Sequence, residues 1–312
     1  MGELSKLPNI GVVIVILILL LVLMAIYHHV MIAIEAKKLN NIGTLVKVND
    51  KNMNVYIEGN KQTNTVVLLS GSGVQAPIYD YKVLYSKLSD ICRVAVVEKF
   101  GYGYSDIAKA KRDVKTMVEE NRIALRKVGI NGPYILMPHS MSALEAIYWA
   151  MTYPEEVKGI IGLDMAVPLT YDENDNNLLS LKFNKIMTFF GFHRISKFCP
   201  VSERELTDKE IKQNKYLVYR NSLNKNVFEE CKLVYSNAKV VEKIGIPSIP
   251  ILMFASKLTG SETSKRWRIA QEKFASESNK CELIILECGH NLHYYESDYM
   301  TVKIREFIVT FN

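Results

Sequence analysis

Short, unbroken apolar runs alternate with stretches of helical period through most of the chain, and this alternation restricts the fold more than any other feature of the sequence. The runs are TVVLLS (65–70), RVAVVE (93–98), YILMP (134–138), VKGIIGLD (157–164), IPILMFAS (249–256) and ELIILE (282–287). A strand buried on both faces is apolar along its whole length, and helices between such strands cover both faces of a parallel sheet. The sequence therefore predicts an α/β fold, with a mostly parallel sheet and helices on both faces.

Two segments depart from this alternation. On either side of residues 49–52, the segments TLVKVND and MNVYIEG alternate polar and apolar residues, which predicts an antiparallel hairpin before the parallel strands. Residues 168–246 contain no strand-like run and instead show several helical stretches rich in Phe, Met, Leu and Tyr. Because this region lies between two strands, we expect a helical cap inserted into the core. Some of its apolar side chains are expected to line a substrate pocket, and others to pack the cap onto the core.

The N-terminal region contains an uncharged apolar run from Ile10 to Tyr27, IGVVIVILILLLVLMAIY. As a helix it would be about 27 Å long at 1.5 Å per residue, close to the thickness of a bilayer core. A cleaved signal peptide has a shorter apolar core, and a cleavage site with small residues follows it. Here the apolar run is longer, and no such cleavage site follows it. We therefore expect one transmembrane helix that anchors the chain in a lipid bilayer. Lysines after the span favour a cytoplasmic domain, but a long domain can cross a membrane regardless of charge, so the side stays open.

These features divide the chain into six parts. They are a short tail (1–8), a transmembrane anchor (9–34), a linker (35–42), the first part of the core (43–167), a helical cap (168–246) and the second part of the core (247–312). The net charge is +6 and the lysines are spread along the chain, which gives little support to nucleic-acid binding. The five cysteines are widely spaced, without a C-x-x-C pair, so we expect neither a disulfide framework nor a metal site. No cofactor is expected, and no particular protein partner is indicated.

Ser140 lies in the segment LMPHSMSAL, between a predicted strand and a predicted helix. This junction is the setting of a nucleophile elbow, in which a tight turn strains the serine backbone and crowds the positions two residues before and after it. Ser142 is small, and Pro138 lies at a strand end, where its missing N–H is tolerated. A serine at a helix start can also be an ordinary N-cap. The strand before Ser140 and the helix after it favour the nucleophile.

Two further loops carry groups that a nucleophilic serine needs. The segment LSGSG follows the strand at 65–70, and its glycines let backbone N–H groups face a ligand. The N–H of Ser72 and that of Met141 are candidates for an oxyanion hole. In the segment CGHNLHYYE after the last strand, His290 has the best placement of the six histidines for a general base, and His293 is its competitor.

The acid that would orient this base has two candidates. Asp164 ends the strand VKGIIGLD, at the edge of a parallel sheet where ligand chemistry gathers. Glu262 follows the strand IPILMFAS, in a loop that contains no aspartate. We prefer Asp164 because its strand is well defined, and Glu262 remains the alternative.

Taken in order, these motifs resemble those of the α/β-hydrolase superfamily, in its branch of capped esterases and peptidases, over residues 43–312. The segments that carry the resemblance are LSGSG in place of H-G-x-G, EKFGYGYSD for D-x-P-G-x-G-x-S-D, PHSMS in place of G-x-S-x-G, YPEEVKGIIGLD and CGHNLH. The departures from the family pattern are Ser70 for histidine, Glu98 for aspartate, Phe100 for proline and Pro138 for glycine. The resemblance implies that Ser140 is the nucleophile, His290 the base, and Ser72 and Met141 the oxyanion hole.

The expected function is that of a membrane-anchored serine hydrolase that cleaves an ester or related acyl bond of a small molecule. One alternative is an aminopeptidase similar to proline iminopeptidases, which would need an acid near the cap to hold the substrate amine. The candidates for that acid are Glu203, Glu205 and Asp208. The other alternative is a catalytically silent, membrane-tethered binding module, which the altered elbow motif suggests.

Overall fold

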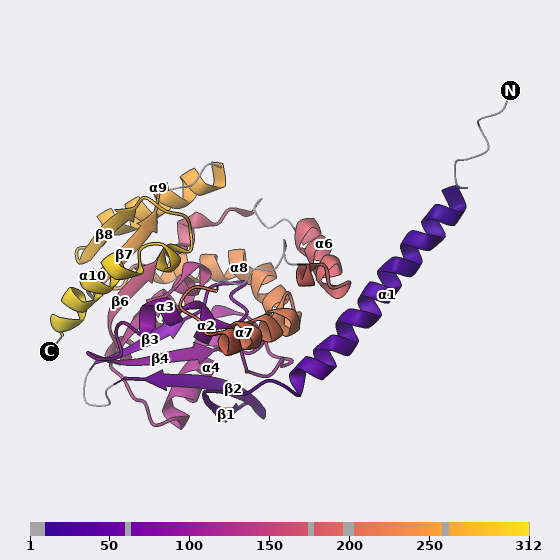
Figure 1. The fold of residues 1–312 in the computed structure, drawn as a ribbon. Helices are drawn as coiled ribbons and strands as arrows, with labels where there is room; N and C mark the ends of the chain where they lie inside the picture. Colours follow the sequence, from indigo (N-terminus) through magenta and orange to yellow (C-terminus); the bar gives the residue numbers. More distant parts are fainter. Residues whose placement is uncertain (1–9, 60–63, 174–177, 196–202, 258–261, 312) are drawn as a thin grey trace.

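The computed structural model describes residues 10–59, 64–173, 178–195, 203–257 and 262–311, and its centre is an eight-stranded sheet (Figure 1). The strand order is β1-β2-β4-β3-β5-β6-β7-β8. All pairs from β4 onward in this order are parallel. The strands are β1 (Thr44–Val48), β2 (Lys51–Glu58), β3 (Thr65–Leu69), β4 (Arg93–Glu98), β5 (Tyr134–Pro138), β6 (Val157–Leu163), β7 (Ile251–Ser256) and β8 (Cys281–Leu286). The six unbroken apolar runs are thus the parallel strands, which confirms the predicted fold class.

The predicted hairpin is also present. β1 and β2 pair antiparallel, with Val48 opposite Lys51, and β2 then pairs antiparallel with β4. The two residues of the turn, Asn49 and Asp50, have φ angles of 47° and 65°. Positive φ at both central residues matches the right-handed twist of the flanking strands, and Asn and Asp adopt it more readily than other residues that carry a side chain.

Helices cover both faces of the sheet because alternate strand residues point to opposite sides. In β3, Val67 and Leu69 belong to one apolar core, and Val66 and Leu68 belong to the other. The first core is closed by α4 (Val114–Lys127), α5 (Ala143–Thr152), α8 (Lys225–Ile244) and α9 (Glu262–Glu277), and the second by α2 (Pro77–Asp80), α3 (Lys82–Tyr85) and α10 (Ser297–Val309). The sheet is therefore covered by helices on both of its faces, as the sequence pattern predicts.

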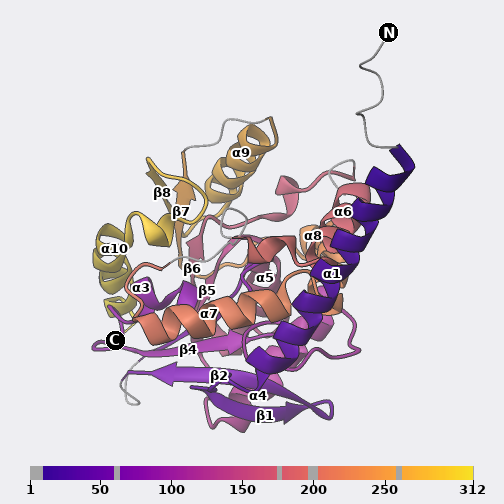
Figure 2. The ribbon, with the colours of Figure 1, turned by 45° about the vertical axis from the view of Figure 1, so that its right-hand side comes forward.

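The region predicted to form the cap has helices and no strand among its described residues. It contains α6 (Leu178–Phe189), the short helix η5 (Phe192–Arg194), α7 (Asp208–Asn221) and α8. α7 begins with a capping box between Thr207 and Glu210, and Asn224 caps the start of α8. Apolar residues of α7 and α8 enter the two cores, whereas α6 lies away from the sheet, beside α1 (Figures 1 and 2).

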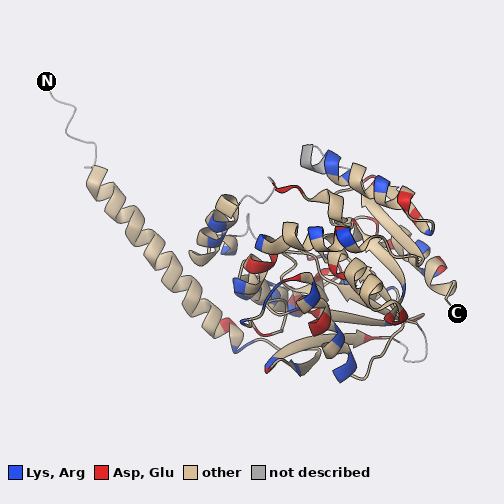
Figure 3. Ribbon diagram, turned by 180° about the vertical axis from the view of Figure 1, so that it is seen from behind, with Lys and Arg blue, Asp and Glu red and all other residues tan. Residues whose placement is uncertain are grey.

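α1 (Ile10–Ala36) projects from the rest of the molecule. It is long and apolar enough to cross a membrane, and most of its length lies outside the body of the protein. Figure 3 shows no charged residue along it except near its C-terminal end. Within the described residues, its buried side chains lie in its C-terminal half and are Ala25, His28 and Glu35. The helix ends two residues beyond the predicted anchor, which stopped at residue 34.

Candidate active site

Ser140 lies at a strained turn between β5 and α5. Its φ angle is 55°, in the left-handed region that residues with a side chain rarely adopt. Pro138 ends β5 opposite Leu69 of β3, and the next residue, His139, donates its N–H to the Leu69 carbonyl at 3.1 Å. The chain then enters the short helix η1 (Ser140–Ser142), which leads into α5. This is the elbow geometry that the flanking strand and helix predict.

Ser142 holds the turn through its hydroxyl group. Its Oγ lies 2.8 Å from the carbonyl oxygen of Leu69 and accepts the N–H of His139 at 3.0 Å. A glycine at this position would provide the space but not these hydrogen bonds. The sequence indicates only that Ser142 is small, so its bonding role emerges from the structure.

His290 lies between Ser140 and Asp164. Its Nε2 is 2.9 Å from Ser140 Oγ, and its Nδ1 is 2.7 Å from Asp164 Oδ2. Asp164 directly follows β6 with a φ angle of 44°, and its side chain is almost fully buried. The side chain of His290 is 44% exposed, so a ligand can reach the imidazole. The structure therefore brings together three side chains from positions that span 150 residues of the chain.

The surroundings of Asp164 keep its carboxylate ionised. Burial alone would raise the pKa of Asp164, but hydrogen bonds from His290, Gln271 and Ser256 outweigh burial and lower the pKa. Ser256 at the end of β7 donates its N–H and Oγ–H, each at 3.0 Å, and Gln271 of α9 donates from Nε2 at 2.9 Å. An ionised carboxylate fixes the imidazole tautomer with the proton on Nδ1.

Glu262, the alternative acid, begins α9, but its side chain lies outside the described residues. The same helix contributes Trp267, whose ring stands edge-on to His290 with 5.3 Å between centroids. Sequence reasoning missed Ser256, Gln271 and Trp267. Only Ser256 carried a signal, as the last residue of a predicted strand, because the other two depend on how α9 packs against the sheet.

The loop after β3 approaches Ser140 closely. A Cβ atom placed on Gly71 would lie 2.9 Å from the His139 carbonyl oxygen and 3.0 Å from Ser140 Cβ. Only glycine permits this approach. In the described part of the chain, neither the N–H of Ser72 nor that of Met141 donates a hydrogen bond, so both remain available to a ligand oxygen. Ser72 Oγ lies 3.0 Å from Cys231 Sγ of the cap helix α8.

His139 connects three loops of the site. Gly71 N–H donates to Tyr81 Oη at 3.3 Å, Tyr81 Oη lies 3.0 Å from His139 Nδ1, and His139 Nε2 lies 3.4 Å from the carbonyl oxygen of His290. Burial and the nearby His290 and His293 hold the pKa of His139 well below its usual value. The neutral ring accepts from Tyr81 and donates to the His290 carbonyl. His293, the competing base candidate, is instead buried against Asp80, with 3.2 Å between Nε2 and Oδ2.

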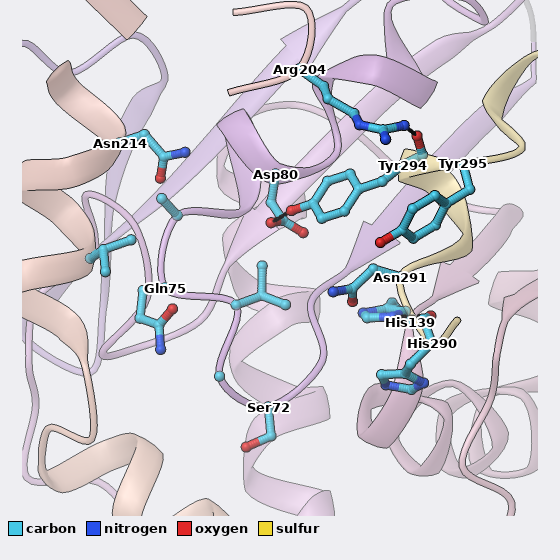
Figure 4. A pocket seen from close by; sticks show the side chains of 14 residues that line it. Ser72, Gln75, Asp80, His139, Arg204, Asn214, His290, Asn291, Tyr294 and Tyr295 are labelled. Carbon is cyan, nitrogen blue, oxygen red and sulfur yellow. Dashed lines mark hydrogen bonds between the residues drawn. The ribbon is translucent and has the colours of Figure 1, made fainter. Parts of the chain in front are cut away.

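A cavity of about 490 Å³ opens beside His290, between the core and the cap (Figure 4). Its walls are mainly polar, which differs from the apolar lining expected of the cap. The lining residues include Ser72, Gln75, Asp80, His139, Arg204, Asn214, Val218, His290, Asn291, Tyr294 and Tyr295. Among the described residues of the cap, Arg204, Asn214 and Val218 line the cavity, and no residue of α6 does. The three acids proposed to hold a substrate amine, Glu203, Glu205 and Asp208, do not line this cavity.

The segment EKFGYGYSD has a structural role, as its glycine-punctuated pattern suggests. The buried carboxylate of Glu98 accepts the N–H of Tyr104 at 2.7 Å and the Nδ2–H of Asn54 at 3.0 Å. Gly103 has a φ of 48° and passes so close to this carboxylate that a Cβ would overlap it.

Among the described residues, no group of three or more His, Cys, Asp or Glu side chains is arranged to hold a metal ion.

Comparison with models of known protein families found no match. Over 295 residues, the chain is 35% identical to the uncharacterized protein YbdG of Bacillus subtilis (strain 168), an alignment that covers 91% of this chain and 90% of YbdG. It is 26% identical over 103 residues to the uncharacterized protein YqjL of the same organism, which covers 33% of this chain and 40% of YqjL.

Solved structures resemble the chain in fold. Haloalkane dehalogenase DbeA from Bradyrhizobium elkani USDA94 superposes with a TM-score of 0.61 at 14% identity, covering 86% of this chain and 97% of that one. Cfl2 from Burkholderia cenocepacia superposes with a TM-score of 0.62 at 16% identity, covering 85% of this chain and 95% of that one. The similarity therefore extends over nearly the whole described body of the molecule.

Proposed function

The chain belongs to the same family as Bacillus subtilis YbdG and has the α/β-hydrolase fold, and from this premise we propose that it is a membrane-anchored serine hydrolase that cleaves an ester or related acyl bond. The observation that carries the proposal is the hydrogen-bonded line from Ser140 through His290 to Asp164. The line begins at a serine with a strained backbone, and its middle member, His290, lines the cavity in which we propose that a substrate carbonyl is attacked.

In the proposed reaction, His290 Nε2 takes the proton of Ser140 as Oγ attacks the carbonyl carbon. The N–H groups of Ser72 and Met141 stabilise the resulting oxyanion. His290 then gives the proton to the leaving oxygen, and an acyl-enzyme remains on Ser140. A water molecule, deprotonated by His290, attacks this ester and releases the acid, and the proton returns to Ser140. Throughout, Asp164 holds the imidazole and stabilises its cationic form.

The chemistry of a serine nucleophile favours acyl substrates over alkyl halides, although DbeA is named a haloalkane dehalogenase. Displacement of a halide by Ser140 would form an ether, which has no carbonyl for water to attack. An acyl-serine ester has one. The polar walls of the cavity, with Gln75, Asn214 and Asn291, further favour a short acyl group attached to a polar leaving group.

The aminopeptidase alternative has one supporting observation, because the carboxylate of Asp80 lines the cavity. That carboxylate is already engaged by the hydroxyl of Tyr294 and by His293, so a substrate amine would have to share it. A silent binding module would not need the strained φ of Ser140, which is retained only where the surrounding structure enforces it.

The test is to treat the full chain, in detergent, with a fluorophosphonate probe and to compare it with Ser140→Ala. We expect covalent labelling of the wild type and none of the variant. Hydrolysis of p-nitrophenyl acetate by the wild type but not by Ser140→Ala would extend the result to turnover. Equal labelling of both chains would place the nucleophile elsewhere. A folded wild type that neither labels nor turns over the ester would favour the silent module.

A further inference from the structure

We infer that the cap helix α6 lies in the surface of the bilayer that α1 spans, so that the cap contacts lipid through a helix of its own. The inference rests on the membrane anchoring included in the proposed function. Its basis is an exposed apolar face on α6 and the place where α6 is fastened to α1.

The outward face of α6 is apolar. Leu179 is 79% exposed, Phe183 59%, Ile186 54% and Phe189 54%. Their spacing of four, three and three residues confines them to about 120° of the helix circumference at 100° per residue. A contiguous row of large exposed apolar side chains is uncommon on a soluble surface and marks an interaction site.

The opposite side of α6 packs onto the cap. Asn184, Met187 and Thr188 line a cavity of about 350 Å³ together with Phe192, His193 and Leu223, and Phe183, at one edge of the apolar row, reaches the same cavity. Lys185 Nζ lies 4.1 Å from the ring centroid of Phe228 on α8. Leu179, Ile186 and Phe189 do not line this cavity and are more than half exposed, so they form an outward surface rather than a part of the core.

The C-terminal end of α6 and the residues after it contact α1 between His28 and Glu35. The ring of Phe189 lies 4.9 Å from that of His29, and a Cβ on Gly191 would lie 2.8 Å from His28 Cβ. Just beyond, the guanidinium of Arg194 donates to both carboxylate oxygens of Glu35, at 2.9 and 2.8 Å, and to His28 Nδ1 at 2.7 Å. Both side chains of the Arg194–Glu35 pair are nearly buried. This contact sets the position of α6 along α1.

That position coincides with the end of the apolar span. From Ile10 to His29, α1 rises about 28 Å at 1.5 Å per residue, close to the roughly 30 Å of a bilayer hydrocarbon core. α6 therefore meets α1 where hydrocarbon gives way to headgroups, and Figures 1 and 2 both show it beside α1, away from the sheet.

Lipid suits this face better than a second copy of the chain does. The row on α6 continues the apolar surface of α1, where Ile26 is 55% exposed and Val30 is 52% exposed. Lys182 is also exposed on the outward side, and its long side chain can place the ammonium group among lipid phosphates while its stem stays in apolar surroundings. At 100° per residue, Lys182 falls between Ile186 and Phe189 around the helix, and an apolar face that carries a basic residue is typical of helices that lie in a membrane surface.

The test uses the full chain in lipid nanodiscs, with a single added tryptophan and acyl-brominated phosphatidylcholine as the quencher. Ile186→Trp, at an outward position that does not line the cavity beneath α6, reports on this helix, and Leu179→Trp gives an independent reading nearer the helix start. Leu17→Trp on α1 is the positive control, and Ile269→Trp, at an exposed position of α9, is the negative control. The emission of Trp149 and Trp267 is subtracted as the wild-type background.

We expect the brominated lipid to remove most of the added emission of both α6 variants and of Leu17→Trp, and to leave that of Ile269→Trp unchanged. Quenching of Leu17→Trp without quenching of either α6 variant would overturn the inference and leave the anchor intact. If Leu17→Trp also kept its emission, the membrane anchoring would fail together with the inference. Unquenched α6 emission that shifts to the blue as the number of chains per disc increases would identify a second copy as the occupant, which also overturns the inference.

Discussion

At the scale of single residues, the choice of acid is the first point to test. Asp164→Asn keeps the shape of the side chain but removes the charge that fixes the His290 tautomer, and an amide also presents N–H groups to the donors of Ser256 and Gln271. We expect kcat to fall by about 10⁴-fold, the effect of the same change in a serine protease triad. Ester turnover is the measurement, and Glu262→Gln is the matched control, expected to retain activity. Loss of turnover in the Glu262→Gln variant alone would show that the assignment is wrong.

Gly71 tests how closely the loop after β3, which carries the candidate oxyanion donor Ser72, must approach Ser140. In Gly71→Ala, the added methyl group would press on the His139 carbonyl and on Ser140 Cβ, so the loop must move away. We expect kcat/KM to fall by about 10- to 100-fold, since small displacements of reacting groups have effects of this size. Gly289→Ala is the control, because a methyl group there meets no atom within 4 Å. Equal activity of the two variants would argue against an oxyanion role for the loop.

Glu98 makes the stability of the fold depend on pH. Burial raises the pKa of Glu98 from 4.5 to about 7. Between these values the folded chain holds a proton that the unfolded chain has lost, so stability falls as the pH rises through this window. Glu98→Gln removes the ionisation. We expect the variant to be more stable than the wild type at pH 8, by up to about 3 kcal/mol, and the difference to disappear below pH 4.5. Thermal unfolding at a series of pH values measures it, and parallel curves for the two chains would contradict the prediction.

At the scale of elements, a buried ion cluster joins the cap to the core. Lys99, just after β4, lies 2.6 Å from Glu145 of α5 and 2.5 Å from Glu230 of α8, and all three side chains are at most 2% exposed. Tyr102 donates to the second oxygen of Glu230, and Asn121 donates to that of Glu145. The residue after Glu230 is Cys231, whose sulfur contacts Ser72. The cluster therefore positions α8 against the loop that carries Ser72, the candidate oxyanion donor.

Lys99→Met would leave two buried carboxylates without their cation. We expect a loss of about 3–5 kcal/mol in the free energy of unfolding, the usual cost of breaking a buried pair from one side. Denaturant unfolding measures it. The control is Lys239→Met, which removes an exposed partner of Glu242 and is expected to leave the unfolding midpoint unchanged. A similar midpoint for Lys99→Met would mean that the cluster contributes no net stability.

At the scale of the whole molecule, α1 and the cap form one attached unit beside the sheet. Gln213 of α7 accepts the N–H of Asn40 and donates to the carbonyl of Lys38, so the segment after α1 is held by the cap as well. We expect the full chain to stay with membranes after alkaline carbonate washing and a chain of residues 37–312 to be released. Sedimentation followed by immunoblotting measures the distribution. Release of the full chain would argue against a spanning helix.

The sequence by itself determined the architecture and the position of the candidate nucleophile, because both are encoded locally. An unbroken apolar run such as RVAVVE predicts a strand that is buried on both faces, and β4 has the predicted bounds. Ser140 could be assigned to an elbow because the strand before it and the helix after it are adjacent in the chain. The apolar run at Ile10 likewise predicted a helix long enough to span a membrane.

The tertiary structure decided which side chains meet. Asp164 and Ser256 are neighbours only because β6 pairs with β7, and Gln271 joins them only because α9 packs over these strands. The polar lining of the cavity could not be predicted from the sequence either, since the apolar composition of the cap does not reveal which of its faces points toward His290. Strand and helix patterns follow from neighbours along the chain, whereas contacts in a site depend on strand order and helix packing, which bring distant segments together.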